Sequence, residues 1–497
     1  SPLTFRWSTL APLRTWALWP VGPTAASVSA ENLPRSPRGW LARTAFGTRL
    51  TLIVALGLVV RLLHLFLVAA DNPLSGDAAS YHLGANLFAD GLGFTEPFRY
   101  LYGAVDEILL DGRAVEVVTP IGHLEPTAGH PPGWTLLLGI GAFLGLTGVF
   151  EAQLLATVLG LPAIALVGLA GRRLGSERLG LISAGLAATY AFVWINDGLL
   201  MAETVAIGAA AGTVLVGLQF ATSPDRRNAA LLGLVGGLAA LCRAELVLYL
   251  PLVAAIVLVN KPLPWRERLL RYFVVGLAAL VVVSPWIVRN LLVFEEPVLL
   301  SNGAGTVLVQ ANCDPTYYGP DLGYWQISCG QPAPYGPGGE LLDESQRDRV
   351  VRDRAFDYIR AHQGRLVDTV VPARAGRLWA VYQPVGQLRL DTLVDRRSFA
   401  VSVLGLVQYY LLVPFAAAGV VLLWRRRGAL LVVTAWIPVV TLTAVTAFGN
   451  TRYRTAAEVS LILLAAVAID ATIGRWSSAR TTQSTGPSVE QPPGGSS

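Results

Sequence analysis

Residues 51–70, TLIVALGLVVRLLHLFLVAA, form an apolar run long enough to cross a bilayer, and residues 71–77, DNPLSGD, follow it at once. Arg61 and His64 stand three positions apart inside the run, so they must face protein or water rather than lipid; a purely structural role is the alternative to a functional one. Where the run ends, the chain places an acidic residue, Asp77, at the membrane edge. A carboxylate held there is suited to act as a base.

The composition of the chain is that of a membrane protein. Of its 497 residues, 53% are hydrophobic and only 14% are charged, whereas soluble proteins carry about 25% charged residues. Together with repeated apolar runs of about 20 residues, this predicts an all-α polytopic membrane protein. The net charge of +5 comes from arginines that cluster between the apolar runs, as in cytoplasmic loops, so the expected partner is the lipid bilayer and no nucleic acid.

The charge pattern also predicts the topology. Arg35, Arg38, Arg43 and Arg49 precede the first run, which places the N-terminus in the cytoplasm. We expect about ten spans in the plasma (inner) membrane, with both termini cytoplasmic. The expected spans cover residues 50–70, 152–171, 179–197, 203–221, 228–242, 245–260, 272–290, 398–424, 429–448 and 456–474.

This topology divides the chain into three parts. Residues 48–475 form the transmembrane domain. Residues 1–47 and 476–497 have no sustained apolar period and are expected to be disordered cytoplasmic tails. No apolar core with a cleavage site stands out near the start, so no signal peptide is expected.

The first outer loop, residues 71–149, is predicted to carry helices on the membrane surface. A helix is expected at 78–90, a hairpin around Asp111-Gly112, and a second apolar helix at 131–146 that begins at a Pro-Pro pair. That second helix is apolar enough either to span or to lie flat. Lying flat puts every later basic loop in the cytoplasm, whereas spanning inverts them all, so we expect it to lie flat.

The second outer loop, residues 291–397, contains two of the three cysteines. Because Cys313 and Cys329 both fall on the expected outer side, we predict a disulfide between them. The third, Cys242, lies in an apolar run and is expected to be an inert small side chain. A charged stretch at 343–362 has a partial apolar face and is predicted to be helical.

Three acidic residues are candidates for catalysis. Asp77 precedes a helix, where Asp is also a favoured N-cap, and a cap and a base do not exclude each other. Asp197 and Glu203 flank the next outer turn, from which they can approach Asp77 and bind a cation or orient an acceptor. The alternative is that both are solvated loop acids, with Glu203 favoured by the dipole of the helix it starts.

The sequence requires no cofactor, but a divalent metal ion, Mg²⁺ or Mn²⁺, is the candidate. Asp77, Glu203 and His130 are its candidate ligands. His130 and His123 precede the flat helix, where a single His is alternatively structural. No Cys/His cluster has the spacing of a zinc site.

Four arginines lie at the expected outer ends of spans, namely Arg243, Arg289, Arg452 and Arg454. Guanidinium groups pair with phosphate oxygens in a bidentate manner. Each alone is also explained by snorkelling to lipid headgroups. Positive residues on the outer face run against the usual bias, so as a set they predict a binding site for a lipid phosphate.

Six short motifs follow one another in a set order along the chain. They are Gly76–His82, His130–Trp134, Gly171–Gly175, Leu241–Glu245, Pro285–Asn290 and Arg452–Arg454. In this order the chain resembles the C-type (GT-C) glycosyltransferase superfamily over residues 48–475, in the branch of protein O-mannosyltransferases and the lipid A aminoarabinose transferase. Many relatives carry an acidic pair in the first loop, whereas here Ala78 follows Asp77, which shifts weight to Asp197 or Glu203.

The resemblance implies a reaction. A sugar would pass with inversion from a polyprenyl-phosphate donor to an envelope acceptor (a glycan, lipid or protein) on the extracytoplasmic face. Asp77 would deprotonate or orient the acceptor hydroxyl. The four arginines would stabilise the phosphate leaving group. The implied substrate or loop residues are Tyr81, His82 and His130.

Residue usage suggests the source and the sugar. Lys261 is the only lysine against abundant Arg, Ala, Leu and Gly, which is typical of a GC-rich genome. Mannosyl or arabinofuranosyl transfer in an actinobacterial envelope is therefore expected.

Two other classes of protein are weighed against an enzyme. A lipid or sugar transporter, or flippase, is also polytopic with buried Arg and His, but it should show paired repeats or broken helices in two halves, and none is found in the sequence. An envelope scaffold has no need of Asp, His and Arg together on one face.

Overall fold

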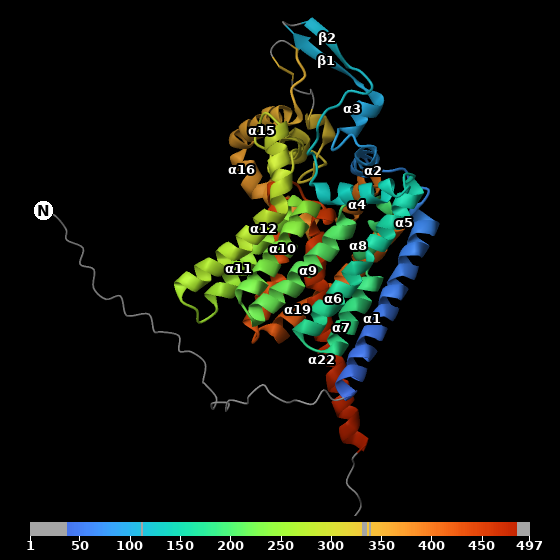
Figure 1. The fold of residues 1–497 in the computed structure, drawn as a ribbon, viewed down its shortest axis with the longest axis vertical. Coiled ribbons are helices and arrows are strands. Elements are labelled where there is room, and N and C mark those ends of the chain that lie inside the picture. The colour runs from blue at the N-terminus through green and yellow to red at the C-terminus, as the bar shows by residue number, and fades with distance from the viewer. Residues whose placement is uncertain (1–36, 111–112, 331–334, 337–338, 485–497) are drawn as a thin grey trace, which may run out of the picture. The chain divides into compact units, whose positions relative to one another are not determined.

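The computed structural model describes residues 37–110, 113–330, 335–336 and 339–484 (Figure 1). The chain divides into two units, residues 1–45 and 46–497, and the second contains nearly all of the helices and both strands. The first helix, α1 (Pro37–His64), begins at a proline, which favours a helix start, so it reaches into the predicted tail 1–47. Residues 1–36 of that tail lie outside the described residues.

The larger group of helices forms a bundle (Figure 1). Its members are α1, α5 (Val149–Leu159), α6 (Leu161–Leu174), α7 (Glu177–Thr189), α8 (Ala191–Trp194), α9 (Glu203–Thr222), α10 (Arg226–Cys242), α11 (Tyr249–Val259), α12 (Trp265–Val293), α19 (Phe399–Leu423), α20 (Arg427–Thr434), α21 (Trp436–Thr446) and α22 (Thr455–Ser484). Because α22 runs to Ser484, it passes the predicted tail boundary at 476, and residues 485–497 lie outside the described residues.

The remaining elements cover one end of the bundle, which we call the loop face, built by residues 71–148 and 294–398 (Figure 1). They are α2 (Gly76–Ala89), α3 (Pro97–Tyr102), β1 (Ala104–Leu110), β2 (Arg113–Thr119), α4 (Pro132–Phe143), α13 (Ala304–Ala311), α14 (Asp314–Tyr317), α15 (Glu344–Ala361), α16 (Gln363–Arg365), α17 (Val371–Leu378) and α18 (Pro384–Asp395).

Fewer than ten helices in the described part of the chain are long and apolar enough to span a membrane. Among the described residues, seven helical segments are long and apolar enough to cross a membrane, and the pair α7 and Ala191–Leu199, bent by 69°, makes an eighth if it is one span. The count of about ten is therefore not confirmed. The predicted spans 228–242 and 245–260 correspond to α10, with 17 residues, and α11, with 11 residues. At 1.5 Å per residue neither reaches the about 30 Å of a hydrocarbon core.

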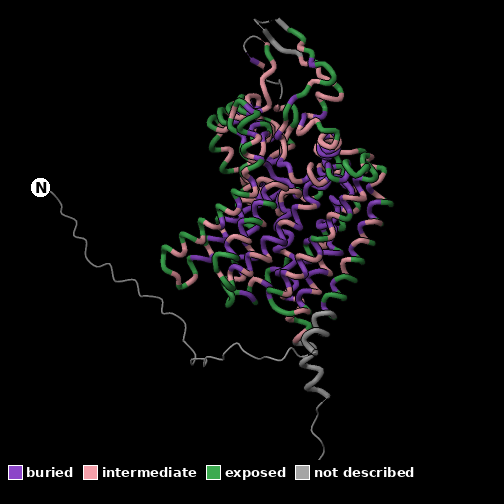
Figure 2. Tube along the Cα trace, viewed as in Figure 1, coloured by how far each residue is buried: buried purple, intermediate pink, exposed green. Residues whose placement is uncertain are grey.

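Small residues let the helices of the bundle approach closely. A Cβ on Gly233 or Gly237 would collide with α12, and one on Gly419 would collide with the backbone of Leu464 in α22. Buried residues accordingly fill the middle of the bundle, while exposed ones lie on its outside (Figure 2). Arg61 and His64 have relative exposures of 1% and 6%, which confirms that they face protein.

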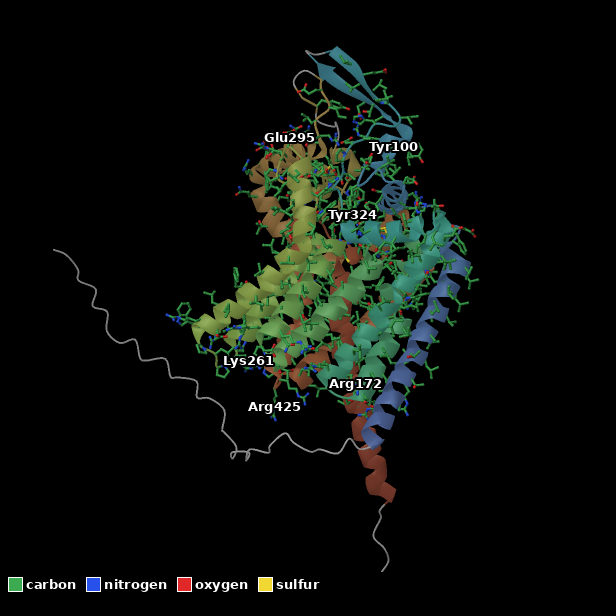
Figure 3. The ribbon with its side chains drawn as sticks, in the orientation of Figure 1. Tyr100, Arg172, Lys261, Glu295, Tyr324 and Arg425 are labelled. Atoms are coloured by element: carbon green, nitrogen blue, oxygen red, sulfur yellow. A yellow bond between two sulfur atoms is a disulfide. The ribbon has the colours of Figure 1, made fainter. Side chains whose placement is uncertain are left out.

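The basic loops gather at the end of the bundle opposite the loop face. Arg172 and Arg425 lie at that end, and Glu295 lies at the loop face (Figure 3). Arg426 Nη1 donates to the carbonyl of Leu174 at 3.2 Å, which joins the loops that follow α6 and α19. The basic loops therefore share one end, as the predicted topology requires.

We expect this basic end to be cytoplasmic. Cysteines placed at Ser176 and Arg426 should both resist a membrane-impermeant thiol reagent in intact cells and react after the membrane is opened. The physical reason is that arginine-rich loops of membrane proteins remain on the cytoplasmic side. Labelling of both sites from outside would invert the topology, and labelling of only one would contradict the contact between the two loops.

The first outer loop has the elements that its sequence predicts, with shifted ends. The helix expected at 131–146 is α4, whose 12 residues are too short to cross a bilayer. It lies across the end of the bundle, as Figure 1 shows, which agrees with the flat arrangement. The predicted hairpin is the antiparallel pair β1 and β2, in register from Ala104↔Thr119 to Leu110↔Arg113. Its predicted turn, Asp111-Gly112, lies outside the described residues.

The second outer loop confirms two predictions. Cys313 and Cys329 form a disulfide bond. The charged stretch at 343–362 is α15, which Asp343 caps by accepting a hydrogen bond from the Gln346 amide at 2.7 Å. The Gln346 side chain accepts in return from the Asp343 amide, so both ends of the capping pair fix where α15 begins.

Candidate functional site

Helix α2 begins in a way that leaves Asp77 free of a capping role. Ser75, not Asp77, is the N-cap, and its Oγ accepts from the Ala78 amide at 3.3 Å. The interpretation of Asp77 as an N-cap is therefore wrong. Its carboxylate lies in the first turn of the helix and is available to other partners.

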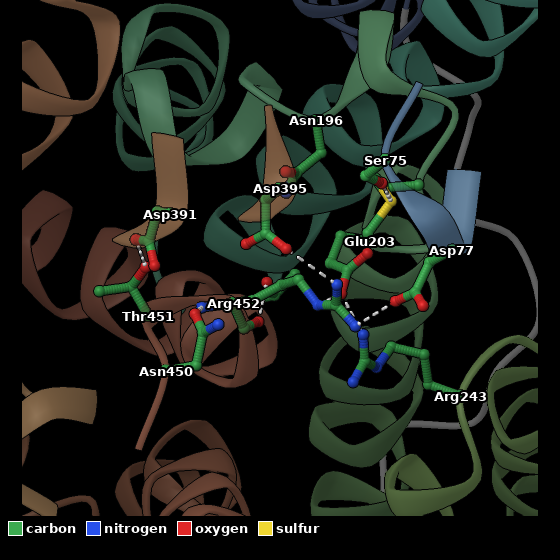
Figure 4. A network of polar contacts seen from close by, with 12 residues as sticks. Ser75, Asp77, Asn196, Glu203, Arg243, Asp391, Asp395, Asn450, Thr451 and Arg452 are labelled. Carbon is green, nitrogen blue, oxygen red and sulfur yellow. Dashed lines mark hydrogen bonds and ion pairs between the residues drawn. The ribbon is translucent and has the colours of Figure 1, made fainter. Parts of the chain in front are cut away.

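Arg452 joins three carboxylates that come from distant parts of the chain (Figure 4). Its Nη2 donates to Asp77 Oδ2 at 2.8 Å, and its Nη1 donates to Asp395 Oδ1 at 3.1 Å. Its Nε lies 2.9 Å from Glu203 Oε1. One guanidinium thus ties α2, α9 and the end of α18 together at the loop face.

Arg243 extends this cluster from the end of α10. Its Nη1 pairs with Glu203 Oε1, and its Nε donates to Glu245 Oε1 at 2.6 Å. Glu203 therefore interacts with two arginines. We call Asp77, Glu203, Arg243, Glu245, Asp395 and Arg452 the Arg452 cluster.

A second polar network fixes the turn that carries Arg452. Asn450 caps this turn by accepting from the Arg452 amide at 2.8 Å, and Thr451 Oγ1 donates to Asp391 Oδ2 at 2.6 Å. Arg397 Nη1 lies 3.6 Å from the same Asp391 oxygen. The turn is thereby bound to α18 and, through Arg397, to the short segment that follows it.

Asp77 is the most accessible of the three carboxylates on Arg452. Its side chain is 38% exposed, whereas those of Glu203 and Asp395 are 1% and 3% exposed. Burial alone would raise the pKa of Asp77, but Arg452 and then His130 outweigh it and lower the pKa to about 2. Asp77 is therefore ionised at every physiological pH.

His130 borders the cluster through Tyr81. The two rings lie with their centroids 4.5 Å apart. Burial lowers the pKa of His130, and the attraction of Asp77 only partly offsets this, so the imidazole is neutral near pH 7. The structure thus brings together Asp77, Glu203, Arg243 and Arg452, with Tyr81 and His130 beside them.

Other predicted residues lie outside the cluster. Asp197 Oδ2 pairs with Arg61 Nε at 2.5 Å inside the bundle, so it does not accompany Glu203. His82 is buried on α2. Arg454 is buried, where its Nε donates to Glu458 Oε1 at 2.6 Å and its guanidinium lies 3.8 Å from the centre of the Tyr409 ring.

Arg289 is also apart from the cluster. It donates to the backbone carbonyls of Thr127 at 3.0 Å and Phe94 at 3.1 Å. Its guanidinium lies 5.0 Å from the centre of the Trp286 ring. Of the four predicted phosphate-binding arginines, Arg243 and Arg452 therefore lie in the cluster. Arg289 instead binds backbone carbonyls, and Arg454 pairs with a glutamate in the core of the bundle.

The predicted metal ligands do not form a ready metal site. Among the described residues, no group of three or more His, Cys, Asp or Glu side chains is arranged to hold a metal ion. The guanidinium of Arg452 lies between Asp77 and Glu203, where a bridging cation would have to be. The donor set as folded therefore does not fit a divalent ion.

Two members of the cluster were not found from the sequence, Asp395 and Glu245. Asp395 stands directly before the predicted span 398–424, as Asp77 stands just after the first span. An acidic residue at the membrane edge is therefore the signal that points to both. Glu245 stands two positions from Arg243 in one of the motifs, where only the arginine was given a role.

A cavity of about 180 Å³ lies beside the cluster, on the far side of Tyr81 and His130. Its lining residues are Ser80, Tyr81, Gly84, Phe94, Thr95, Glu96, Pro97, Thr127, Ala128, Gly129, His130, Thr135 and Glu344. Glu344 reaches it from α15, across the loop face, and its Oε2 accepts from the Ala128 amide at 2.8 Å.

Glu344 should make stability depend on pH. Burial raises its pKa to about 7, although hydrogen bonds from Ala128 and Thr127 and the charge of Arg347 oppose this. The folded protein thus keeps a proton that the unfolded chain releases near its usual pKa of about 4.3. Stability should be highest below that value and fall as pH rises through 7. We expect Glu344→Gln to remove this loss, gaining up to about 3 kcal/mol at pH 8.

Thermal unfolding of both proteins at pH 5 and pH 8 measures this effect. Other charged groups around Glu344 are Asp343, Glu125, Glu96, His130 and Arg289, and Glu344→Gln leaves all of them in place. The same pH dependence in both proteins would assign it to those groups instead.

Comparisons with known proteins bear on the fold. Residues 129–288 match the family described as dolichyl-phosphate-mannose-protein mannosyltransferase. No curated protein matches the sequence. Two structures of the oligosaccharyltransferase from Archaeoglobus fulgidus are similar. The apo form is 11% identical, covers 90% of this chain and 52% of that chain, and has a TM-score of 0.52.

The second archaeal structure is AglB in complex with an inhibitory peptide and a dolichol-phosphate, at 12% identity, 91% and 53% coverage and a TM-score of 0.53. This chain therefore spans about half the length of the archaeal enzymes it matches. ArnT from Cupriavidus metallidurans bound to undecaprenyl phosphate is 17% identical over 92% of this chain and 82% of that chain. Its TM-score of 0.37 is too low to bear on the fold.

These comparisons confirm the fold expected from the sequence. The chain is an all-α, multi-pass membrane protein with the fold of the C-type glycosyltransferase superfamily.

Proposed function

We propose that this chain is an inverting glycosyltransferase that uses a polyprenyl-phosphate sugar as donor and a hydroxyl of an envelope molecule as acceptor. The observation that carries the proposal is Asp77, a partly exposed carboxylate that Arg452 holds ionised on the loop face of this fold. The match of residues 129–288 to a mannosyltransferase family supports the reaction class. The dolichol-phosphate in the archaeal AglB structure, which shares the fold, supports a polyprenyl donor.

Asp77 contributes to the reaction by orienting the acceptor hydroxyl and does not retain the proton that this hydroxyl loses. The acceptor oxygen forms a bond to the anomeric carbon, and the bond from that carbon to the phosphate oxygen breaks with its electron pair. A carboxyl group with a pKa of about 2 binds a proton weakly. Because attack with inversion is in line, the hydroxyl and the leaving phosphate lie on opposite faces of the anomeric carbon, so the hydroxyl proton passes by way of Asp77 to water. The polyprenyl phosphate, whose second pKa is about 6, leaves mostly as the dianion near pH 7. Asp77 holds the hydroxyl in line and eases this proton transfer.

Arg243 and Arg452 are the arginines that we propose for the donor phosphate. Their side chains are 14% and 18% exposed, and both lie at Asp77 or its neighbour Glu203. Each is already paired with carboxylates, so a phosphate can bind to either arginine only by replacing one of these carboxylates. Arg289 and Arg454 hold backbone carbonyls and a buried glutamate, which gives them a positioning role.

The purified full chain in proteoliposomes tests the donor class. Polyprenyl-phosphate mannose and polyprenyl-phosphate arabinofuranose are each incorporated, a crude envelope extract supplies acceptors, and released polyprenyl phosphate is measured by mass spectrometry. Parallel samples contain Mg²⁺, Mn²⁺ or a chelator, because the metal requirement stays a prediction. Release above that of empty liposomes is expected with one donor, and none with either donor would overturn the proposal.

A further inference from the structure

The cavity behind Tyr81 and His130 continues the face of α2 that carries Asp77. Ser80, Tyr81 and Gly84 line the cavity, and Asp77 lies one helical turn before the first two of them. Positions three, four and seven residues apart share one face of a helix. The cavity and the Arg452 cluster are therefore neighbours along a single helix face, with the Tyr81–His130 ring pair between them.

The lining of this cavity suits a neutral molecule with several hydroxyl groups. Ser80, Thr95, Thr127 and Thr135 provide hydroxyls, and Phe94 and Tyr81 provide ring surfaces. None of the described residues that line it is Lys or Arg, and two, Glu96 and Glu344, are acidic. The lining therefore offers an anion no cationic partner. A cavity of about 180 Å³ far exceeds the about 30 Å³ of one water molecule.

Glu344 is the least expected of the lining residues. The neighbouring Arg347 pairs with Glu125, and Glu344 has no ion pair within the described part of the chain. Its Oε2 accepts from the Ala128 amide, while its Oε1 lies 3.0 Å from where a Cβ on Gly129 would be. A glycine at 129 therefore leaves the space that this carboxyl group needs. Arg347 and Arg289 are near enough to act on the charge of Glu344, but neither pairs with it. A buried carboxyl group without a direct partner is costly, so a partner in the cavity would account for it.

We propose that this cavity is the acceptor subsite, which binds a neutral polyol, a sugar, and that Glu344 accepts a hydrogen bond from one of its hydroxyls. The proposal rests on the proposed function, since it places the acceptor next to Asp77. It also assigns the second outer loop a part in acceptor recognition, because Glu344 is the first residue of α15.

Binding of small probes to the purified full chain, without any donor, tests the subsite. The probes are methyl α-mannopyranoside and methyl α-arabinofuranoside, with mannose 6-phosphate as the anionic counterpart, and saturation-transfer NMR detects them. We expect at least one neutral probe to bind and the anionic one to bind at least tenfold more weakly. No binding of either neutral probe, or preferred binding of the anion, would overturn the assignment.

Three variants locate the binding, and a fourth controls for glycine replacement. Gly84→Leu fills the cavity, where a Cβ meets only Thr135 Cγ2 at 3.9 Å, so the helix itself is not strained. Glu344→Ala removes the proposed acceptor group, and Glu344→Gln, which keeps an acceptor oxygen, should bind better than Glu344→Ala. Gly185→Leu, in α7 with open space at its Cβ, should bind like the wild type. Unchanged binding in Gly84→Leu and Glu344→Ala would place the probe elsewhere.

The transfer assay separates the two proposals. If donor turnover occurs while Gly84→Leu and Glu344→Ala keep the wild-type KM for acceptor, the subsite is wrong and the glycosyltransferase stands. If the neutral probe binds and both variants abolish it, but no donor is turned over, the polyol site stands and the reaction is wrong.

Discussion

Replacing Arg452 by glutamine should destabilise the folded protein by about 3 kcal/mol, even with no substrate present. Arg452 is the contact that three carboxylates share, and two of them, Glu203 and Asp395, are nearly fully buried. Removing a buried cation leaves its partners uncompensated, which costs about 3–5 kcal/mol. We expect the lower end of that range because Arg452 is 18% exposed and Arg243 still pairs with Glu203.

Thermal unfolding of the purified protein in detergent, compared with wild type, measures this loss. Arg178→Gln is the matched control, because its ion pair with Asp470 lies at the basic end with the arginine side chain 49% exposed, and such pairs are worth at most about 1 kcal/mol. The double variant Arg452→Gln with Asp395→Asn should recover part of the loss, since Asp395 then carries no charge. An unchanged unfolding temperature for Arg452→Gln would show that water satisfies these carboxylates.

The sequence identified four of the six residues of the Arg452 cluster because they break the apolar pattern. Asp77, Glu203, Arg243 and Arg452 all stand at the ends of apolar runs, where the pattern itself places them at one depth. The fold then brings them into contact. Which acid meets which arginine depends on how helices pack around one another, and this is not encoded in hydropathy.

Arg452 and Arg454 illustrate what the sequence left undetermined. They are two positions apart in a turn of 3-10 helix, so their side chains point in directions about 120° apart around its axis. Arg452 reaches the carboxylates of the loop face, and Arg454 turns into the bundle toward Glu458 and Tyr409. The prediction of a single phosphate site for both ignored this divergence, although the spacing of the two residues is enough to separate them.

The count of about ten spans is not confirmed for a related reason. Hydropathy measures how apolar a stretch is, but α10 ends at Cys242, and the next residue, Arg243, is extended and pairs with Glu203 and Glu245. Polar residues at 243 and 245 thus separate two short helices, α10 and α11, that the apolar pattern counts as two spans.

Replacing Asp77 by asparagine should lower the rate of sugar transfer by about 10²–10⁴-fold, the usual contribution of a group that assists proton transfer, while the fold is kept. Asparagine has the same shape and still accepts from Arg452, but it has no charge with which to hold an acceptor hydroxyl. The stability cost should stay within about 1 kcal/mol, because the Asp77 side chain is 38% exposed and Arg452 keeps two buried carboxylates.

The pH dependence sharpens this prediction. Arg452 and His130 lower the pKa of Asp77 to about 2, below that of an unfolded Asp, so its contribution to stability is complete above about pH 4 and is lost only as pH falls through 2. Asp77 therefore adds no acidic limb to the rate between pH 5 and 8. Asp71→Asn, the same change at an exposed residue six positions earlier, is the control and should keep wild-type turnover. The measurements are polyprenyl phosphate release and unfolding temperature for each protein. Normal release by Asp77→Asn would show that Asp77 takes no part in the reaction. A loss of release that matches a fall in unfolding temperature would show that its role is structural.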